Sequence, residues 1–100
     1  MDDVMEKVET KTVHVVISGR VQGVGFRSWT MHTARSMGLD GWVRNRTNQT
    51  VEAMFKGPAD KVDAMLRQCW DGPMISRVRD VQFAQVKKDV EAGFARLPTA

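Results

Sequence analysis

The hydrophobic pattern near the N-terminus predicts a β-strand. Val13, Val15 and Ile17 stand at every second position and are β-branched. This is the period and the side-chain type of a strand that is covered on one face. Gly19 ends the run, and the face formed by positions 13, 15 and 17 is expected to pack against the core.

The pattern changes to a helical period after a glycine-rich loop. Over Phe26–Met37 the apolar residues can line one face of a helix, and Gly38 directly afterwards is typical of a left-handed C-cap. Asp40-Gly41 is then expected to turn the chain into a second strand over Trp42–Arg46.

A polar hairpin joins this strand to the next one. Val51–Lys56 (VEAMFK) indicates a third strand, and the polar stretch Arg46–Thr50 between the two strands has the composition of a turn. We expect Asn48 to take a positive φ in this turn, because asparagine tolerates the left-handed conformation.

The clearest helix begins at Gly57-Pro58. Proline suits the first position of a helix, and Asp60 suits the positive end of its dipole. Cys69, on the apolar stripe of this helix, is interpreted as a small buried hydrophobe and not as a nucleophile. The stripe repeats at i, i+3, i+4 and i+7, which predicts an amphipathic helix facing a sheet. It consists of Val62, Met65, Leu66 and Cys69.

Two further strands complete the pattern. Val81 and Phe83 indicate a fourth strand, and Phe94–Leu97 indicates a short fifth one. The order β-α-β-β-α-β predicts an α+β, ferredoxin-like sandwich with both helices on one face of a mainly antiparallel sheet. Residues 11–97 are expected to form this single domain, between a polar N-terminal extension over 1–10 and a tail over 98–100.

This topology brings two distant segments together. A split βαβ unit makes the first two strands parallel, so their carboxyl ends lie at the same edge of the sheet. The glycine-rich loop leaves the first strand at Gly19, and Asn45 stands near the end of the second strand. We therefore expect the loop and Asn45 to lie close together.

Composition and charge narrow the function classes. Of the 100 residues, 42% are hydrophobic and 27% are charged, as in ordinary globular domains. The N-terminus lacks the apolar core of a signal peptide, and no apolar run approaches the length of a membrane span, so a cytoplasmic location is expected. The formal net charge of +3 favours anionic ligands without choosing among them.

The loop GRVQGVGFR at 19–27 combines three glycines with two arginines. Its glycines permit positive φ and let a ligand approach the backbone closely. Gly25 directly precedes the predicted helix, so the amides of Val24 to Arg27 include the unpaired donors of a helix N-terminus, which favour an anion. Arg27 is placed best if an anion lies between its guanidinium and these amides. The alternative is a plain tight turn with Arg27 in solvent, and the residues alone leave both open.

Few chemical groups accompany this loop. Ser18 and Ser28 have no histidine or lysine placed to activate them, and His14 and His32 lack metal-ligand spacing, so we interpret both histidines as structural. What remains is an anion cradle, one arginine and the amide of Asn45, which can orient water but is a poor base. Such a site suits an acyl phosphate, because a carboxylate leaving group with a pKa of roughly 4 departs unprotonated.

Three segments resemble the acylphosphatase family, enzymes that hydrolyse carboxyl-phosphate bonds to carboxylate and phosphate. They are GRVQGVGFR at 19–27, GLDGWVRN at 38–45 and TVEAMFKGPADKV at 50–62, in the family's order and spacing. The resemblance implies a ferredoxin-like fold and a metal-independent hydrolase of small acyl phosphates, with no cofactor and with inorganic phosphate as a product. The hairpin RTNQT and the tail GFARLPTA depart from the glycine and the Phe-x-Ile-Arg pattern that are usual in the family.

The resemblance also implies roles for individual residues. Arg27 is expected to be the phosphate-binding catalytic arginine, and Asn45 is expected to position the attacking water. We expect a monomer that binds neither nucleic acid nor membranes. The alternative is a non-catalytic ferredoxin-like module that binds phosphate or nucleic acid through the same edge. The implied phosphate-binding segment comprises Gln22, Gly23, Val24, Gly25, Phe26 and Arg27.

Overall fold

The elements follow one another in the predicted order, and a short fifth strand is present near the C-terminus. The computed structural model describes residues 9–100, so positions 1–8 of the predicted N-terminal extension lie outside the described residues. The elements are β1 (Thr10–Arg20), α1 (Phe26–Ser36), β2 (Asp40–Asn45), β3 (Val51–Pro58), α2 (Ala59–Cys69), β4 (Arg77–Gln85) and β5 (Phe94–Arg96).

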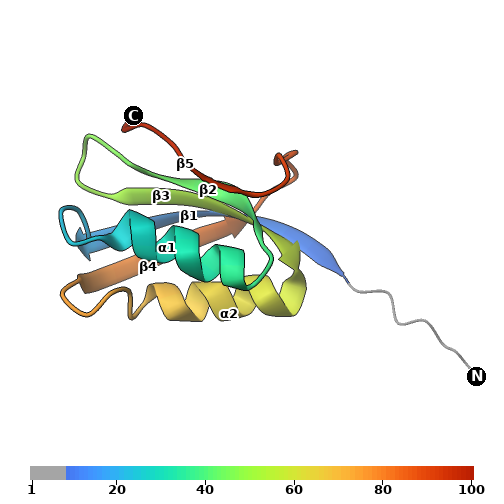
Figure 1. Cartoon of the computed structure of the whole chain (residues 1–100), viewed down its shortest axis with the longest axis horizontal. Coiled ribbons are helices and arrows are strands. Elements are labelled where there is room, and N and C mark those ends of the chain that lie inside the picture. The colour runs from blue at the N-terminus through green and yellow to red at the C-terminus, as the bar shows by residue number, and fades with distance from the viewer. Residues whose placement is uncertain (1–8) are drawn as a thin grey trace, which may run out of the picture.

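One sheet with the strand order β4-β1-β3-β2-β5 carries both helices on the same face (Figure 1). β1 pairs antiparallel with β3 and with β4, and β2 pairs antiparallel with β3. The added strand β5 pairs parallel with β2. This topology confirms the predicted α+β, ferredoxin-like arrangement with a mainly antiparallel sheet.

The core lies between the sheet and the two helices. Val13, Val15 and Ile17 of β1 are at most 1% exposed, as the alternation predicted. The apolar stripe of α2 is buried as expected, and burial raises the pKa of the Cys69 thiol to about 12, which fits a structural cysteine. No helix within residues 9–100 is long and apolar enough to cross a membrane.

The start of β2 differs from the prediction. Asp40-Gly41 does not form a turn, because both residues already belong to the strand. Gly41 pairs with Phe55 of β3 on one side and with Phe94 of β5 on the other, and this double pairing extends the ladder. The turn comes one residue pair earlier, where Gly38 has a φ of 71° and its amide donates to the carbonyl of Arg35, as expected of a left-handed C-cap.

Two other local predictions are wrong by one residue. In the β2–β3 hairpin Gln49, not Asn48, takes the positive φ, at 75°. The Asn48 side chain instead accepts hydrogen bonds from the amide and hydroxyl of Thr50, so the left-handed position falls on the residue between them. Pro58 is the N-cap of α2 and not its first helical residue, because it still pairs with Thr10 at the end of β3.

The sheet order decides where the glycine-rich loop lies. β3 runs between β1 and β2 and is antiparallel to both, so β1 and β2 are parallel and end at the same edge. Figure 1 shows the loop after β1 and the hairpin after β2 at the same end of the molecule. The predicted approach of the loop to the end of β2 is therefore present in the fold.

Gly41→Ala is expected to destabilise the fold strongly. Gly41 has a φ of 140°, and a Cβ there would overlap the carbonyl oxygen of Met54 in the neighbouring strand. Strain and overpacking together are expected to lower the free energy of unfolding by about 3 kcal/mol or more. Gly38→Ala is the control, because at φ 71° no atom lies within 4 Å of the added Cβ, and only the backbone strain of about 1–2 kcal/mol applies. Urea unfolding compares the two variants, and equal losses would contradict the overlap.

Candidate active site

The loop between β1 and α1 forms an open cradle at the helix N-terminus. Gly23 and Gly25 have φ values of 73° and 79°, in the left-handed region that glycine adopts without strain. Gly25 is the N-cap of α1, and no side chain caps this helix end. The amides of the first turn of α1 therefore face the loop without side-chain acceptors, as an anion site requires.

A pocket of about 230 Å³ joins this cradle to the ends of β2 and β5. It contains both Arg27 and Asn45, which confirms the prediction that the glycine-rich loop and Asn45 lie close together. Among the other predicted cradle residues, Gln22 and Val24 do not line the pocket, since Val24 is buried in the core and Gln22 turns its side chain elsewhere. The lining residues are Val21, Gly23, Gly25, Phe26, Arg27, Ser28, Asn45 and Arg96.

Arg27 carries the positive charge of the inner pocket. Its side chain stands in the first turn of α1 and is half-buried. Burial, and then the charge of Arg96 nearby, lowers the pKa of Arg27 from its ordinary value. None of the eight lining residues is acidic. An anion in the pocket would therefore offset both the desolvation cost of the Arg27 charge and the repulsion between the two arginines.

Asn45, the last residue of β2, is 9% exposed. Its backbone is held by pairing with Val51 and by a hydrogen bond from the amide of Ala100 to its carbonyl, at 3.1 Å. Its side-chain Oδ1 is buried, and no donor within the described part of the chain reaches it. A buried acceptor of this kind is unfavourable unless a partner outside the protein satisfies it.

The Gln22 side chain ties the cradle to the hairpin that follows Asn45. Its Nε2 donates to the carbonyl oxygen of Arg46 at 2.8 Å and to that of Thr50 at 2.9 Å. These two bonds join the loop after β1 to both ends of the β2–β3 hairpin, so they fix the distance between the two halves of the pocket. Sequence reasoning assigned Gln22 only a backbone role and gave no sign of this contact.

Glu52 holds the strand ends on the other face of the sheet. Its carboxylate accepts from Arg44 Nε at 2.7 Å and from Arg46 Nη1 at 2.8 Å, and His14 Nε2 lies 2.6 Å from it. Burial alone would raise the pKa of Glu52, but the hydrogen bonds from His14, Arg46 and Arg44 outweigh it and lower this pKa to about 2. In the sequence, Asn45 stands between Arg44 and Arg46, the two arginines that hydrogen-bond to Glu52.

The two histidines lie away from the pocket. His14 contacts Glu52, and His32 is exposed on α1. Within residues 9–100, no three His, Cys, Asp or Glu side chains are grouped so that they could hold a metal ion.

The C-terminal segment contributes more to the site than the sequence indicated. Arg96, the last residue of β5, lines the pocket, and its Nη1 donates to Ser28 Oγ at 3.2 Å. Ala100 donates to the carbonyl of Asn45 and accepts from the amide of Thr47 at 3.1 Å. The tail therefore runs alongside the end of β2, and Arg96 directly before it lines the pocket.

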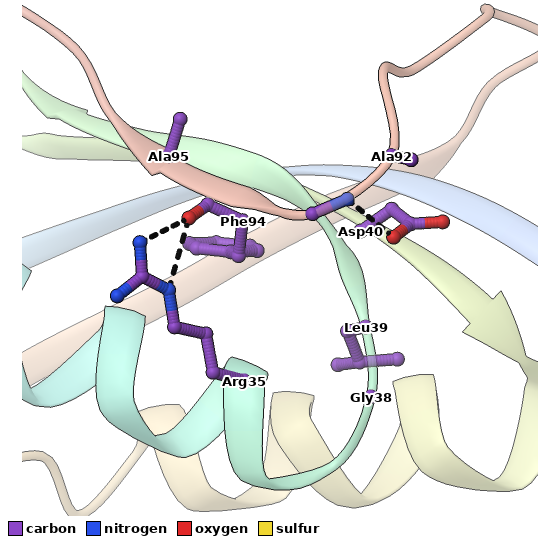
Figure 2. Close-up of a pocket in the computed structure, with 8 residues that line it drawn as sticks. Arg35, Gly38, Leu39, Asp40, Ala92, Phe94 and Ala95 are labelled. Carbon is purple, nitrogen blue, oxygen red and sulfur yellow. Dashed lines mark hydrogen bonds between the residues drawn. The ribbon is translucent and has the colours of Figure 1, made fainter.

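A second, more open hollow lies between α1, β2 and β5 (Figure 2). Figure 2 shows that its polar groups are already used within the fold: Arg35 donates twice to the carbonyl of Phe94, and Asp40 accepts from the amide of Gly93 at 2.8 Å. We interpret this hollow as part of the packing of β5 against α1 and β2, because the charged groups of Arg35 and Asp40 are hydrogen-bonded to the backbone of β5 and of Gly93 before it.

Comparisons with known proteins agree with the geometry. The family model for acylphosphatase matches residues 13–96. The chain is 49% identical over 89 residues to an acylphosphatase of Rhodospirillum rubrum, covering 89% of this chain and 98% of the relative. It is 47% identical to one of Nitrobacter hamburgensis, covering 99% of each. The structure of an acylphosphatase from Coxiella burnetii superimposes with a TM-score of 0.85 at 30% identity, over 88% of this chain and 93% of that one.

Gln22→Ala is expected to lower the free energy of unfolding by about 1–2 kcal/mol, because two backbone carbonyls lose their side-chain donor. Since the same bonds join the two halves of the pocket, the affinity for inorganic phosphate is expected to fall as well. Gln85→Ala, at an exposed position of β4, serves as the control and should change neither quantity. Urea unfolding and phosphate titration measure the two effects. A Gln22→Ala protein as stable as the control would show that the bonds contribute nothing.

Glu52→Gln is expected to reduce the dependence of stability on acid pH. A carboxylate with a lowered pKa stabilises the fold fully above its ordinary pKa of 4.5, and this contribution is lost as the pH falls toward about 2. The shift corresponds to about 3 kcal/mol. The difference in unfolding free energy between the wild type and Glu52→Gln should therefore be largest near neutral pH and should shrink by about this amount at pH 2. Glu91→Gln, at an exposed position, is the matched control. A difference that does not vary with pH would rule out this role of the carboxylate.

Proposed function

Because the chain belongs to the acylphosphatase family and is an acylphosphatase enzyme, we propose that it hydrolyses the carboxyl-phosphate bond of small acyl phosphates in the pocket between the cradle, β2 and β5. The phosphoryl group binds in the segment 22–27, and Asn45 positions the attacking water. The observation that carries this proposal is the buried, unpartnered Oδ1 of Asn45 in the same pocket as Arg27.

The cradle and Arg27 bind the phosphoryl group. The left-handed Gly23 and Gly25 shape the loop, and the amides of the first turn of α1 donate to the phosphoryl oxygens. The guanidinium of Arg27 adds a forked, charged donor. These donors stabilise the charge that spreads over the equatorial oxygens in the transition state more than the charge of the ground state.

Asn45 orients the nucleophile. Its Oδ1 accepts a hydrogen bond from water, which satisfies the buried acceptor and directs the water oxygen at phosphorus. The new bond joins the water oxygen to phosphorus as the bond from phosphorus to the acyl oxygen breaks, and the acyl carboxylate leaves with the electron pair. The proton of the water passes to a phosphoryl oxygen, so the products are the carboxylate and inorganic phosphate.

The pocket favours acyl phosphates over alkyl phosphates. Its lining includes no histidine, aspartate or glutamate among the eight residues, so no side chain there is suited to protonate a leaving alkoxide at neutral pH. A carboxylate with a pKa of roughly 4 leaves without a proton. Positioning and electrostatic stabilisation therefore suffice for the proposed reaction, without metal or cofactor.

A monomer in the cytoplasm remains part of the proposal. Size-exclusion chromatography with light scattering tests the oligomeric state.

Hydrolysis of benzoyl phosphate by the purified protein in excess chelator tests the proposal. The wild type should turn over the substrate. Arg27→Gln should lower kcat by about 10³-fold, because it loses the charged donor to the transferring group. Asn45→Ala should lower kcat by about 10²-fold and nearly keep the affinity for inorganic phosphate, because it loses only the orientation of the water. Arg79→Gln, an exposed arginine on β4, is the charge-matched control. Undiminished activity of both site variants would refute the assigned mechanism.

A further inference from the structure

Arg96 lines the pocket, but the proposed mechanism assigns it no role. It is the last residue of β5, and its side chain is exposed, whereas that of Arg27 is half-buried. By the alternation of a strand, Arg96 points to the same face as the buried Phe94, toward α1, where it meets Ser28. Arg96 therefore stands at the outer, solvent-facing side of the pocket.

Among the residues that the structure describes, the guanidinium of Arg96 has no charged partner. Within residues 9–100 its one side-chain hydrogen bond goes to the hydroxyl of Ser28, at 3.2 Å. A neutral hydroxyl uses one of five donors, so the guanidinium retains its capacity to bind a carboxylate or phosphate in a fork. Its charge also acts on Arg27, whose pKa it helps to lower. The pocket thus presents two positive charges and no negative one among its lining residues.

The phosphoryl group does not require both arginines. The cradle amides and Arg27 already supply its donors at the inner end of the pocket. The volume of about 230 Å³ approaches that of small-molecule pockets, so it accommodates more than a phosphoryl group. With the phosphoryl group in the cradle, the acyl part of the substrate extends outward, toward the side where Arg96 lies.

We propose that Arg96 is a specificity-determining residue that binds a second anionic group on the acyl part of the substrate. The preferred substrates are then acyl phosphates whose acyl chain carries a further negative charge. This inference rests on the proposed function, since it assumes that the phosphoryl group occupies the cradle beside Arg27.

Two substrates of equal chain length test this role. Glutaryl phosphate carries a terminal carboxylate, and pentanoyl phosphate ends in a methyl group. Each is assayed against an enzyme-free blank with the wild type, Arg96→Gln, Arg96→Lys and the charge-matched control Arg79→Gln. Arg96→Gln should lower kcat/KM for glutaryl phosphate about fivefold more than for pentanoyl phosphate, mainly through KM, as expected for the loss of a partly exposed ion pair. Arg96→Lys should restore part of the preference, and Arg79→Gln should leave it intact.

Ionic strength and product inhibition provide measurements that separate the outcomes. The wild-type preference for glutaryl phosphate should shrink as salt is raised to about 0.5 M, because the contact at the pocket mouth is screened; this measurement needs no variant. The inhibition constant of inorganic phosphate should change little in Arg96→Gln. Equal losses on both substrates, together with weaker phosphate inhibition, would place Arg96 on the phosphoryl group and overturn the inference. An unchanged ratio in Arg96→Gln would also overturn it. A folded wild type that hydrolyses neither substrate would refute the proposed function itself.

Discussion

The antiparallel pairing of β3 with both of its neighbours is the constraint on which the site depends. Because β3 lies between β1 and β2, those two strands run in the same direction and end at the same edge of the sheet. The loop that leaves β1 and the last residue of β2 then meet without any direct contact between β1 and β2. Arg27 and Asn45, 18 positions apart in sequence, share one pocket for this reason. The side chain of Gln22 then holds the loop against the β2–β3 hairpin, since it donates hydrogen bonds to both ends of that hairpin.

The alternation of side chains along β3 places the Glu52 carboxylate on the opposite face of the sheet from the two arginines of the pocket. In β3, Val51, Ala53 and Phe55 face the helices and the core, so Glu52 between them faces the other side of the sheet. There its negative charge is fully engaged with three cationic or hydrogen-bonding partners. At the strand ends, beside α1, the pocket contains two arginines and no acid among its lining residues. The Glu52 carboxylate, which lies in the strand paired with β2, therefore stabilises the strand ends without neutralising the cations that are proposed to bind the substrate.

The sequence was sufficient for the elements and for the centre of the site, but not for the contacts that surround it. Period-two and helical patterns predicted the strands and both helices, and the parallel relation of β1 and β2 predicted the approach of Asn45 to the loop. The Gln22 bonds join residues 24 and 28 positions apart, so they follow from the relative placement of two loops and not from any local pattern. A contribution of Arg96 to the site could only be left open for a similar reason, because its position depends on the register of a three-residue strand in the segment where the chain departs from the family's usual tail. The turn at Gln49 was missed because the Asn48 side chain bonds to Thr50.

A site with a cradle, an arginine and an amide separates binding from reaction. If its donors bind the phosphoryl group as proposed, they do so whatever that group is attached to, so inorganic phosphate and alkyl phosphates would fit the same donors as an acyl phosphate. The proposed reaction requires in addition a leaving group that departs without a proton, because the lining includes no histidine, aspartate or glutamate that could protonate it. In the proposed mechanism, selection among phosphorylated compounds occurs in two steps. The chemistry of the leaving group would restrict turnover to acyl phosphates, and the outer side of the pocket, where Arg96 stands, is the place at which one acyl phosphate is proposed to be preferred over another.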